Sequence, residues 1–237
     1  MQARTDLIKT KNIGTINVNI SKHAVTLVTD RLTFKSYNQM DSAQLINQLY
    51  GMLGNPRNVE MFCEGEPWSQ SRVKDYVDRY TCQWSQGNLY APFAVFDSAT
   101  QELIGNLGIY YPVHTYEEIG RGHRNVAEIG YIVDIKHWGK GFGLEMATVG
   151  KKYINNLARQ LNVGSTQEVP VEVTASSHPD NEASKKILKK VLKGREDVIF
   201  KKHNGNPRLM FFKPIKPPVH EASCDSVKPS LSSMRHA

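Results

Sequence analysis

Residues 127–157 read AEIGYIVDIKHWGKGFGLEMATVGKKYINNL, a stretch that joins a strand pattern, a glycine-rich turn and a helix pattern. The opening run Ala127–Val133 is β-branched and has few polar interruptions, which predicts a strand buried on both faces. The closing part carries apolar residues at helical spacing, which predicts an amphipathic helix: Met146, Ala147, Ile154, Leu157 and Leu161. Between them three glycines alternate in Trp138–Gly143 (WGKGFG).

This order of strand, glycine-rich turn and helix start is typical of an anion-binding cradle. Glycine adopts positive φ without strain, so several N–H groups of the turn can converge on one point. The first turn of the following helix adds N–H groups and the positive end of its dipole, and Lys140 adds a mobile charge. The expected ligand is a phosphate or pyrophosphate. The alternative is a plain tight turn whose glycines serve packing alone.

Two well-defined phosphate loops do not fit this turn. A P-loop requires Lys followed by Ser or Thr after its last glycine, whereas Leu144 and Glu145 follow Gly143. The dinucleotide pattern requires G-x-G-x-x-G after a first strand, whereas the run here is G-x-G-x-G.

The run from Glu128 to Tyr131, followed by Trp138–Gly143 and Glu145, resembles the acetyl-CoA motif of the GNAT N-acetyltransferase superfamily. The similarity is greatest to the Rim-type branch, which acetylates the N-termini of ribosomal proteins and often carries Trp in this motif. Residues 29–34 (TDRLTF) are similar to that branch's T-x-R-L-x-L strand, and residues 171–184 extend the resemblance. The resemblance implies a GNAT fold of the mixed α/β class: a mostly antiparallel central sheet of about seven strands with helices on both faces.

The composition suits one globular domain. The chain has 237 residues, 40% of them hydrophobic and 22% charged. No apolar run approaches the roughly 20 residues of a membrane span, and the N-terminus lacks the apolar core of a signal peptide, so we expect a cytoplasmic protein without a membrane partner. Three cysteines without metal-ligand spacing suit a reducing compartment, and no metal is expected.

The net charge of +7 favours polyanionic partners such as nucleic acid, acidic surfaces or coenzyme A. The helix predicted over residues 182–192 is especially rich in lysine, which indicates either a phosphate or RNA contact or a solvated face. No zinc finger or RNA-binding aromatic motif is present in the sequence, so a contact with RNA or the ribosome is the weaker prediction. A monomer and a homodimer both stay open.

We divide the chain into an N-terminal extension (1–22), a GNAT domain (23–213) and a tail (214–237) expected to be disordered. The extension carries nearly alternating isoleucine and valine, and the alternatives for it are an edge strand, a partner-binding arm and partial disorder. Within the domain, strands are expected at 25–37, 89–96, 102–111, 127–133, 167–176, 198–203 and 209–213. Helices are expected at 42–51, 70–85, after the glycine turn, and at 182–192.

The resemblance also implies where acetyl-CoA binds. The pyrophosphate of coenzyme A is expected on the backbone of Trp138, Gly139, Lys140, Gly141, Phe142 and Gly143. The pantetheine arm is expected to run along the central strand past Tyr131, Ile132 and Val133, with N–H groups near the last two binding the thioester carbonyl. Asn181 resembles the family's pantetheine contact.

Acetyl transfer to an amine needs a base for the amine proton and a proton donor for the departing thiolate. The resemblance implies two candidate bases: Glu128, at the start of the central strand where many GNAT enzymes place a base, and Glu172, where one Rim-type enzyme has its glutamate. The alternative for each is a solvated or salt-bridged strand residue. Residues 181–184 match the Rim-type N-x-x-S, so Ser184 is the candidate hydrogen-bond donor to sulfur, or else an ordinary first-turn hydroxyl.

The sequence also departs from the family at two points. The tyrosine that many GNAT enzymes place seven residues after such an asparagine is Leu188 here, and a Gly-Phe pair after the same helix is missing.

From the resemblance as a whole we expect an acetyl-CoA-dependent N-acetyltransferase acting on a primary amine, either a protein N-terminus or a small molecule. The alternative is a catalytically silent acetyl-CoA-binding module. In the first case, Trp68, Tyr76 and Tyr80 would wall the acceptor groove or simply fill the core.

Overall fold

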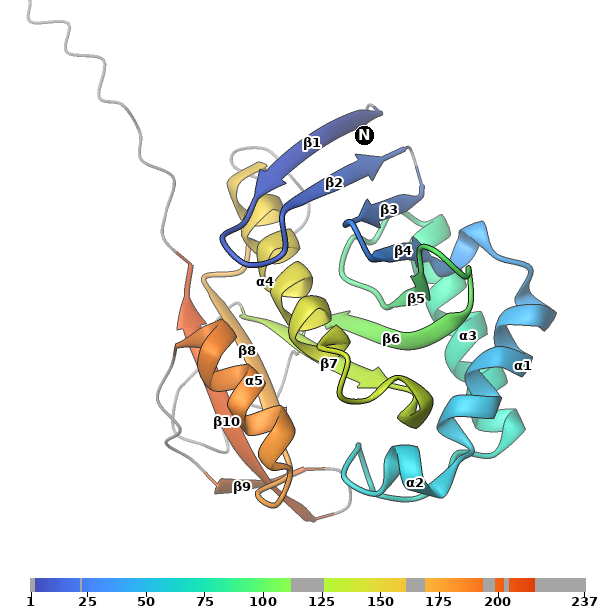
Figure 1. Ribbon diagram of the computed structural model, residues 1–237. Coiled ribbons are helices and arrows are strands. Elements are labelled where there is room, and N and C mark those ends of the chain that lie inside the picture. The colour runs from blue at the N-terminus through green and yellow to red at the C-terminus, as the bar shows by residue number, and fades with distance from the viewer. Residues whose placement is uncertain are drawn as a thin grey trace, which may run out of the picture.

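The computed structural model describes residues 3–21, 23–111, 126–160, 169–193, 199–202 and 205–215. Of the tail predicted at 214–237, residues 216–237 lie outside the described residues, and Pro214 is the last residue of a strand. The described strands form one sheet in the order β1-β2-β3-β4-β5-β6-β7-β8-β10-β9 (Figure 1). The strands are β1 (Arg4–Lys9), β2 (Thr15–Ile20), β3 (Val25–Val28), β4 (Leu32–Ser36), β5 (Phe93–Asp97), β6 (Leu103–Tyr110), β7 (Val126–Val133), β8 (Glu172–Ser177), β9 (Ile199–Lys202) and β10 (Asn206–Pro214).

The helices are α1 (Ser42–Leu53), α2 (Pro56–Val59), α3 (Gln70–Ser85), α4 (Phe142–Gln160) and α5 (Glu182–Leu192). Four of them begin at a capping side chain, which accepts an otherwise unpaired N–H of the first turn. Asp41 accepts from the N–H of Gln44, Asn55 from that of Arg57, Ser69 from that of Arg72, and Asn181 from that of Ser184. None of the helices in the described part of the chain is long and apolar enough to cross a membrane.

The helices cover both faces of the sheet. A methyl group added to Gly150 of α4 would lie 3.2 to 3.3 Å from the side chains of Leu107, Ile109 and Ile129, so α4 packs closely against that face. Asn106 points to the other face, because successive strand residues alternate, and its side chain donates to the hydroxyl of Tyr76 in α3. The sheet is therefore buried between two helical layers, and the predicted mixed, mostly antiparallel α/β class is confirmed.

β7 and β8 are the only parallel neighbours among the described strands, and they separate part of the way along. Their ladder pairs Val126–Glu128 with residues 172–174 and then stops. β7 nevertheless continues to Val133, and β8 continues to Ser177. On its other side β7 stays paired with β6 from Glu128 to Val133. The second half of β7 therefore presents a backbone edge to the gap between the two strands.

The prediction of about seven strands was wrong, because the sheet has ten described strands. The segment predicted as one strand at 25–37 is a hairpin of β3 and β4. Its turn is closed by the N–H of Thr29 donating to the carbonyl of Leu32 and by the Leu32 N–H donating to the Thr29 hydroxyl. β1 and β2 account for the other two strands. Ile16, Val18 and Ile20 of β2 are buried, so the N-terminal segment completes the same core.

Candidate active site

The glycine turn between β7 and α4 has the backbone that a cradle requires. Gly139 and Gly141 have φ values of 75° and 82°, a region that other residues enter only with strain. A Cβ on Gly139 would meet nothing within 4 Å, so packing does not explain this glycine. α4 begins directly behind the turn at Phe142, which brings the N–H groups of its first turn to the same place.

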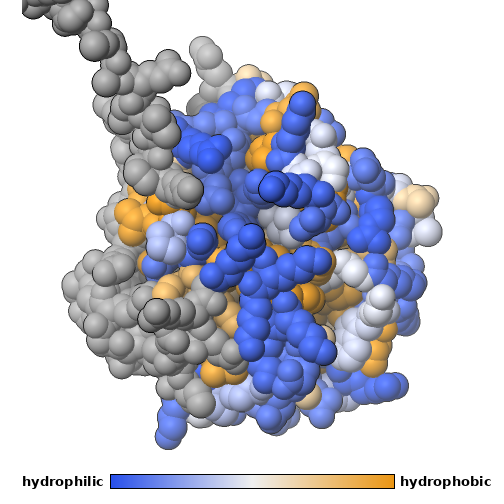
Figure 2. All heavy atoms as spheres, turned by 60° about the vertical axis from the view of Figure 1, so that its left-hand side comes forward, coloured by the Kyte–Doolittle hydropathy of each residue, from blue (hydrophilic) through white to orange (hydrophobic). Residues whose placement is uncertain are grey.

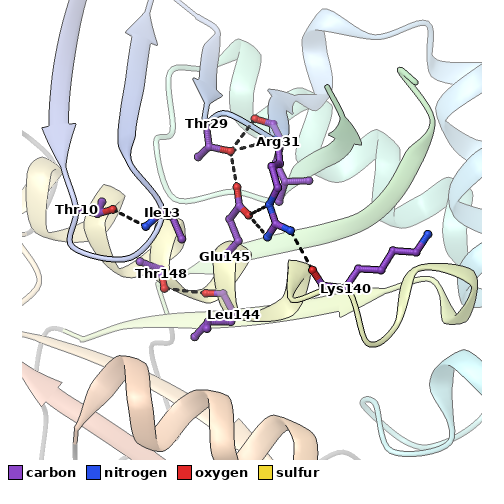
Figure 3. Close-up of polar contacts among 9 residues, drawn as sticks. Thr10, Ile13, Thr29, Arg31, Lys140, Leu144, Glu145 and Thr148 are labelled. Atoms are coloured by element: carbon purple, nitrogen blue, oxygen red, sulfur yellow. Dashed lines mark hydrogen bonds and ion pairs between the residues drawn. The ribbon is translucent and has the colours of Figure 1, made fainter. Parts of the chain in front are cut away.

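The turn is braced by an arginine from the β3–β4 hairpin. Arg31 donates from Nε to Oε2 of Glu145 at 2.8 Å, and its Nη2 contacts the same carboxylate oxygen (Figure 3). Nη1 of Arg31 donates to the backbone carbonyl of Lys140 at 3.0 Å, and the guanidinium lies over the Phe142 ring. Thr29 donates to the other Glu145 oxygen at 2.6 Å. One hairpin therefore fixes both the turn and the first turn of α4.

The same brace keeps the electrostatic character of the turn positive. Glu145 is only 2% exposed and lies in the first turn of α4, where the positive end of the helix dipole stabilises a carboxylate. Its charge is balanced by Arg31, so it does not repel an anion at the turn. The Lys140 side chain extends away from the Arg31–Glu145 pair in Figure 3, and its charge stays at the exposed rim.

A cavity of about 1140 Å³ runs from this turn along β7 to α3. Its lining includes the turn, the whole of residues 128–133, and Ser176 and Ser177 of β8, so it occupies the gap where β7 and β8 separate. The start of α5 adds residues 180–184 and Ile187. The cavity thus joins the glycine turn, the free edge of β7 and the start of α5 in one space.

Strand alternation tells which backbone groups of β7 face the gap. The N–H of Asp134 donates to the carbonyl of Ile104 at the end of β6, so residue 134 faces β6. Because N–H and C=O groups alternate sides along a strand, Ile132 also faces β6, and Tyr131 and Val133 face the gap. The indole Nε1 of Trp138 donates to the Val133 carbonyl at 2.7 Å, which agrees with this direction.

Tyr131 and Ser184 meet across the gap. The hydroxyl of Tyr131 on β7 lies 3.2 Å from the Ser184 hydroxyl on α5, and both residues line the cavity. Burial raises the pKa of Tyr131 to about 12, although the bond to Ser184 works against this rise. Asn181 caps α5 by accepting from the Ser184 N–H at 2.9 Å, which fixes the serine backbone. A protonated phenol and a serine hydroxyl are therefore held together beside the free edge of β7.

The two glutamates predicted as bases lie in different surroundings. Glu128 lines the cavity at the point where β7 and β8 begin to separate, and Ser176 donates to its carboxylate at 3.4 Å. Glu172 is 3% exposed and pairs with Val126 at the closed start of the ladder, outside the cavity lining. The structure brings Glu128 together with the turn and the α5 residues, and it leaves Glu172 apart from them.

A chain of hydroxyl and amide groups lies beside Glu128. Tyr37 donates to Oδ1 of Asn106 at 2.8 Å, Nδ2 of Asn106 donates to the Tyr76 hydroxyl at 3.1 Å, and the Tyr76 and Tyr110 hydroxyls are 2.8 Å apart. Tyr110 is the cross-strand neighbour of Glu128. Burial raises the pKa of Tyr76 and Tyr110 above the ordinary value, so both phenols stay protonated near neutral pH and act as donors.

Several residues of this site were not predicted from the sequence. Tyr110 and Asn106 were taken only as parts of a strand, and Arg31 only as part of a strand motif. Trp68, Tyr76 and Tyr80 do line the cavity. Leu188, at the family's tyrosine position, is 1% exposed and belongs to the core. Within the described ranges, no group of three or more His, Cys, Asp or Glu is placed to hold a metal ion.

The lysine-rich helix α5 forms the edge of the cavity and then continues over the surface. Hydrophilic side chains predominate on the face that carries α5, with apolar side chains in separate patches (Figure 2). Lys186, Lys189 and Lys190 are exposed there. A contact of this face with RNA or the ribosome stays a prediction.

Known proteins are similar to this chain in sequence and fold. A family model described as an acetyltransferase (GNAT) domain matches residues 31–191. The uncharacterized protein YkkB of Bacillus subtilis (strain 168) is 27% identical over 169 residues, which cover 70% of this chain and 83% of YkkB.

Two solved structures show the fold. The ribosomal-protein-S5-alanine acetyltransferase of Vibrio fischeri matches with a TM-score of 0.57 at 15% identity, over 81% of this chain and 97% of that one. RimL, a ribosomal L7/L12 alpha-N-protein acetyltransferase in complex with coenzyme A, matches with a TM-score of 0.54 at 15% identity, over 79% of this chain and 96% of that one. At these identities the likeness concerns the fold alone.

Proposed function

Because the chain belongs to the GNAT acetyltransferase family, whose domain model matches residues 31–191, we propose that it transfers the acetyl group of acetyl-CoA directly to a primary amine. The observation that carries this proposal is the joining of the positive-φ glycine turn and the free edge of β7 in one cavity. The glycine turn suits a pyrophosphate, and the free edge of β7 suits an extended arm that contains amide groups. The fold relative RimL was solved with coenzyme A, which supports the choice of co-substrate.

In this proposal the pyrophosphate binds the N–H groups of Trp138–Gly143, and the pantetheine arm lies along β7 as an added strand would. The N–H groups of Tyr131 and Val133, which face the gap, bind the arm or the thioester carbonyl. Donors fixed in the backbone stabilise the developing oxyanion without reorganisation, which is how such groups contribute to catalysis. The side chains at these positions matter less than the separation of β7 from β8.

The proton transfers are assigned to groups that line the cavity. Glu128 removes the proton of the attacking amine, directly or through a water molecule, because it lines the cavity at the closed end of the gap. Ser184 donates a hydrogen bond to the departing sulfur. The Tyr131 phenol is the stronger acid of the pair and donates to the Ser184 oxygen, which leaves the serine hydrogen free to point into the cavity.

The acceptor is a protein N-terminal amine or a small-molecule amine. The Rim-type motifs of the sequence favour a protein N-terminus, and the ribosomal-protein acetyltransferases among the fold relatives are consistent with it. One observation favours a second candidate, a module that binds acetyl-CoA without transferring its acetyl group: the family's proton-donating tyrosine is replaced by the buried Leu188.

The test is release of free thiol from acetyl-CoA over a panel of peptide and small-molecule amines, with the acetylated product identified by mass spectrometry. We expect acetylation of at least one amine and thermal stabilisation by acetyl-CoA. Stabilisation without turnover of any acceptor would favour the silent module. The absence of both would contradict any coenzyme A function.

A further inference from the structure

Beyond the strand gap, the cavity is lined by α2, α3, the segment between them, Tyr110 of β6 and Arg208 of β10. We call this part the acceptor end, because it adjoins Glu128 through Tyr110. Its polar and aromatic lining comprises Arg57, Glu60, Glu64, Trp68, Arg72, Tyr76, Arg79, Tyr80, Tyr110 and Arg208.

Three arginines of the acceptor end stand on α2 and α3. Arg72 is already engaged, since it pairs with Glu64 at 2.8 Å and its guanidinium lies 4.1 Å from the centre of the Trp68 ring. Arg57 and Arg79 are exposed and form no ion pair with any described residue. Arg72, Tyr76 and Arg79 are spaced by four and three residues, so α3 presents them on one face.

Two donors buried at the same end have no hydrogen-bond partner among the described residues. Trp68 is 8% exposed and Arg208 is 4% exposed, and the unpartnered atoms are the indole Nε1 and the guanidinium Nε. The other nitrogens of Arg208 donate to the carbonyls of Met61 and Cys63, which places the side chain under the cavity rim. A buried donor without a partner is unfavourable, so a ligand oxygen that reaches it is favoured.

The carboxylates of this end do not balance all of its arginines. Glu64 is held by Arg72, and Glu128 accepts from Ser176 and also lies near the Arg208 guanidinium. Glu60 is exposed at the rim and forms no ion pair with a described residue. The surplus at the acceptor end is therefore cationic and donor-rich, which suits a substrate that brings oxygen acceptors with negative charge.

Aromatic rings supply the surface between Glu128 and the arginines. Tyr76 lies edge-on to Trp68 and to Tyr80, with ring centres 5.3 Å and 4.8 Å apart, and Tyr80 lies 5.9 Å from Tyr110. Such a row of rings binds the carbon skeleton of a ligand and leaves its polar ends to the groups on either side.

We propose that the acceptor is an amine that also carries a carboxylate: its amine lies at Glu128 and its carboxylate lies against Arg79, which precedes Tyr80 at the other end of the row of rings. Two sources share this chemistry, a protein N-terminus followed by acidic residues and a free amino acid with a side-chain carboxylate. The inference rests on the proposed acetyl transfer and adds the class of acceptor to it.

The test compares kcat/KM for thiol release from acetyl-CoA with three peptides that share one N-terminal residue. The next three positions hold Glu, Gln or Lys. A second arm compares free acidic amino acids with their side-chain amides, which distinguishes the two sources. One exposed charge-assisted contact predicts about threefold higher kcat/KM for the carboxylate-bearing member of whichever arm is the substrate, and this difference should shrink as salt rises.

Arg79→Gln should remove most of that preference, mainly by lowering kcat/KM for the Glu peptide or the free acid. Lys74→Gln is the matched control, because it removes one positive charge from α3 outside the cavity lining. Equal rates for the Glu, Gln and Lys peptides and for acids and amides would overturn the inference but leave acetyl transfer intact. Failure to acetylate any amine would instead overturn the proposed function.

Discussion

Arg31 and Glu145 lie 114 residues apart in the sequence, yet their side chains meet directly behind the glycine turn (Figure 3). The contact joins the β3–β4 hairpin to the first turn of α4, and the third guanidinium nitrogen holds the Lys140 carbonyl. The backbone of the turn is therefore fixed from outside the strand–turn–helix unit. Such a brace prearranges N–H groups for an anion before the anion arrives.

Breaking this pair should loosen the turn and weaken cofactor binding together. For Arg31→Gln we expect the free energy of unfolding to fall by about 2 kcal/mol, because the buried Glu145 carboxylate loses its partner while half of the Arg31 side chain was already exposed. The dissociation constant for coenzyme A should rise at least about fivefold. Urea unfolding and titration calorimetry measure both, and an unchanged affinity would show that the brace does not serve the turn.

Arg31→Gln combined with Glu145→Gln provides the control for that prediction. The double variant should lose less stability than the sum of the single variants, because neither partner is then left as an unpaired charge. Strict additivity of the two losses would mean that the residues act independently.

Gly139 separates the conformational role of the turn from its binding role. Gly139→Ala should cost about 1 kcal/mol of folding stability for a φ of 75° and raise the dissociation constant for coenzyme A at least about tenfold. Gly87→Ala is the matched control, since Gly87 has a φ of 82°, equally open surroundings, and lies outside the cavity lining. Gly87→Ala should cost similar stability without changing the affinity for coenzyme A. Equal affinities of the two variants for coenzyme A would contradict an anion-binding role of the turn.

The sequence predicted the turn and its flanking elements well because their signals are local. A β-branched run, alternating glycines and helical apolar spacing lie next to one another, and the caps Asp41, Ser69 and Asn181 stand immediately before their helices. The helix boundaries at 70–85 and 182–192 match the structure. Each of these features is decided by neighbours a few residues away.

Features without a clear local signal in the sequence were not predicted. The β3–β4 turn was missed because its central residues, Asp30 and Arg31, are neither glycine nor proline. Hydrogen bonds between Thr29 and Leu32 close the turn instead. The hydroxyl chain from Tyr37 through Asn106 to Tyr110 joins three elements, so no spacing in the sequence reveals it. Which glutamate faces the cavity depends on where β7 and β8 separate, which is a property of the sheet.

Glu128 and Glu172 are distinguished by their position relative to that separation. Glu128→Gln should lower kcat by about 10²- to 10⁴-fold, the usual effect of removing a general base, while the melting temperature changes little. Glu172→Gln should affect stability rather than kcat, because Glu172 is buried outside the cavity lining. Kinetics on folded protein checks both, and the reverse pattern would assign the base to Glu172.

Tyr131 and Ser184 are expected to act after the amine has attacked. Tyr131→Phe keeps the ring that packs beside Gly143 but removes the bond to Ser184, so kcat should fall about tenfold with the KM for acetyl-CoA unchanged. Ser184→Ala should lower kcat at least as far, and the double variant should lower it no further. With a pKa of about 12, Tyr131 should add no basic limb to the rate profile below pH 11. Additive losses would contradict a joint role.

The buried tyrosines predict the behaviour of the fold at high pH. Burial raises the pKa of Tyr37, Tyr76, Tyr110 and Tyr153 above 10, so the native state keeps phenol protons that the unfolded chain releases. Their stabilising effect is complete below pH 10 and is lost as the pH rises further. Between pH 10 and 11, each tyrosine should lower the free energy of unfolding by up to about 1.4 kcal/mol per pH unit. Urea unfolding at several pH values should show that stability falls less steeply with pH for Tyr76→Phe than for the unchanged protein. An identical pH dependence would contradict this assignment.

The most direct measurement is a crystal structure with acetyl-CoA bound. We predict the pyrophosphate within hydrogen-bonding distance of backbone N–H groups in residues 139–143, the pantetheine arm between β7 and β8 beyond Glu128, and the thioester within reach of Ser184. A coenzyme bound elsewhere, or a β7–β8 gap filled by side chains in its presence, would contradict the account.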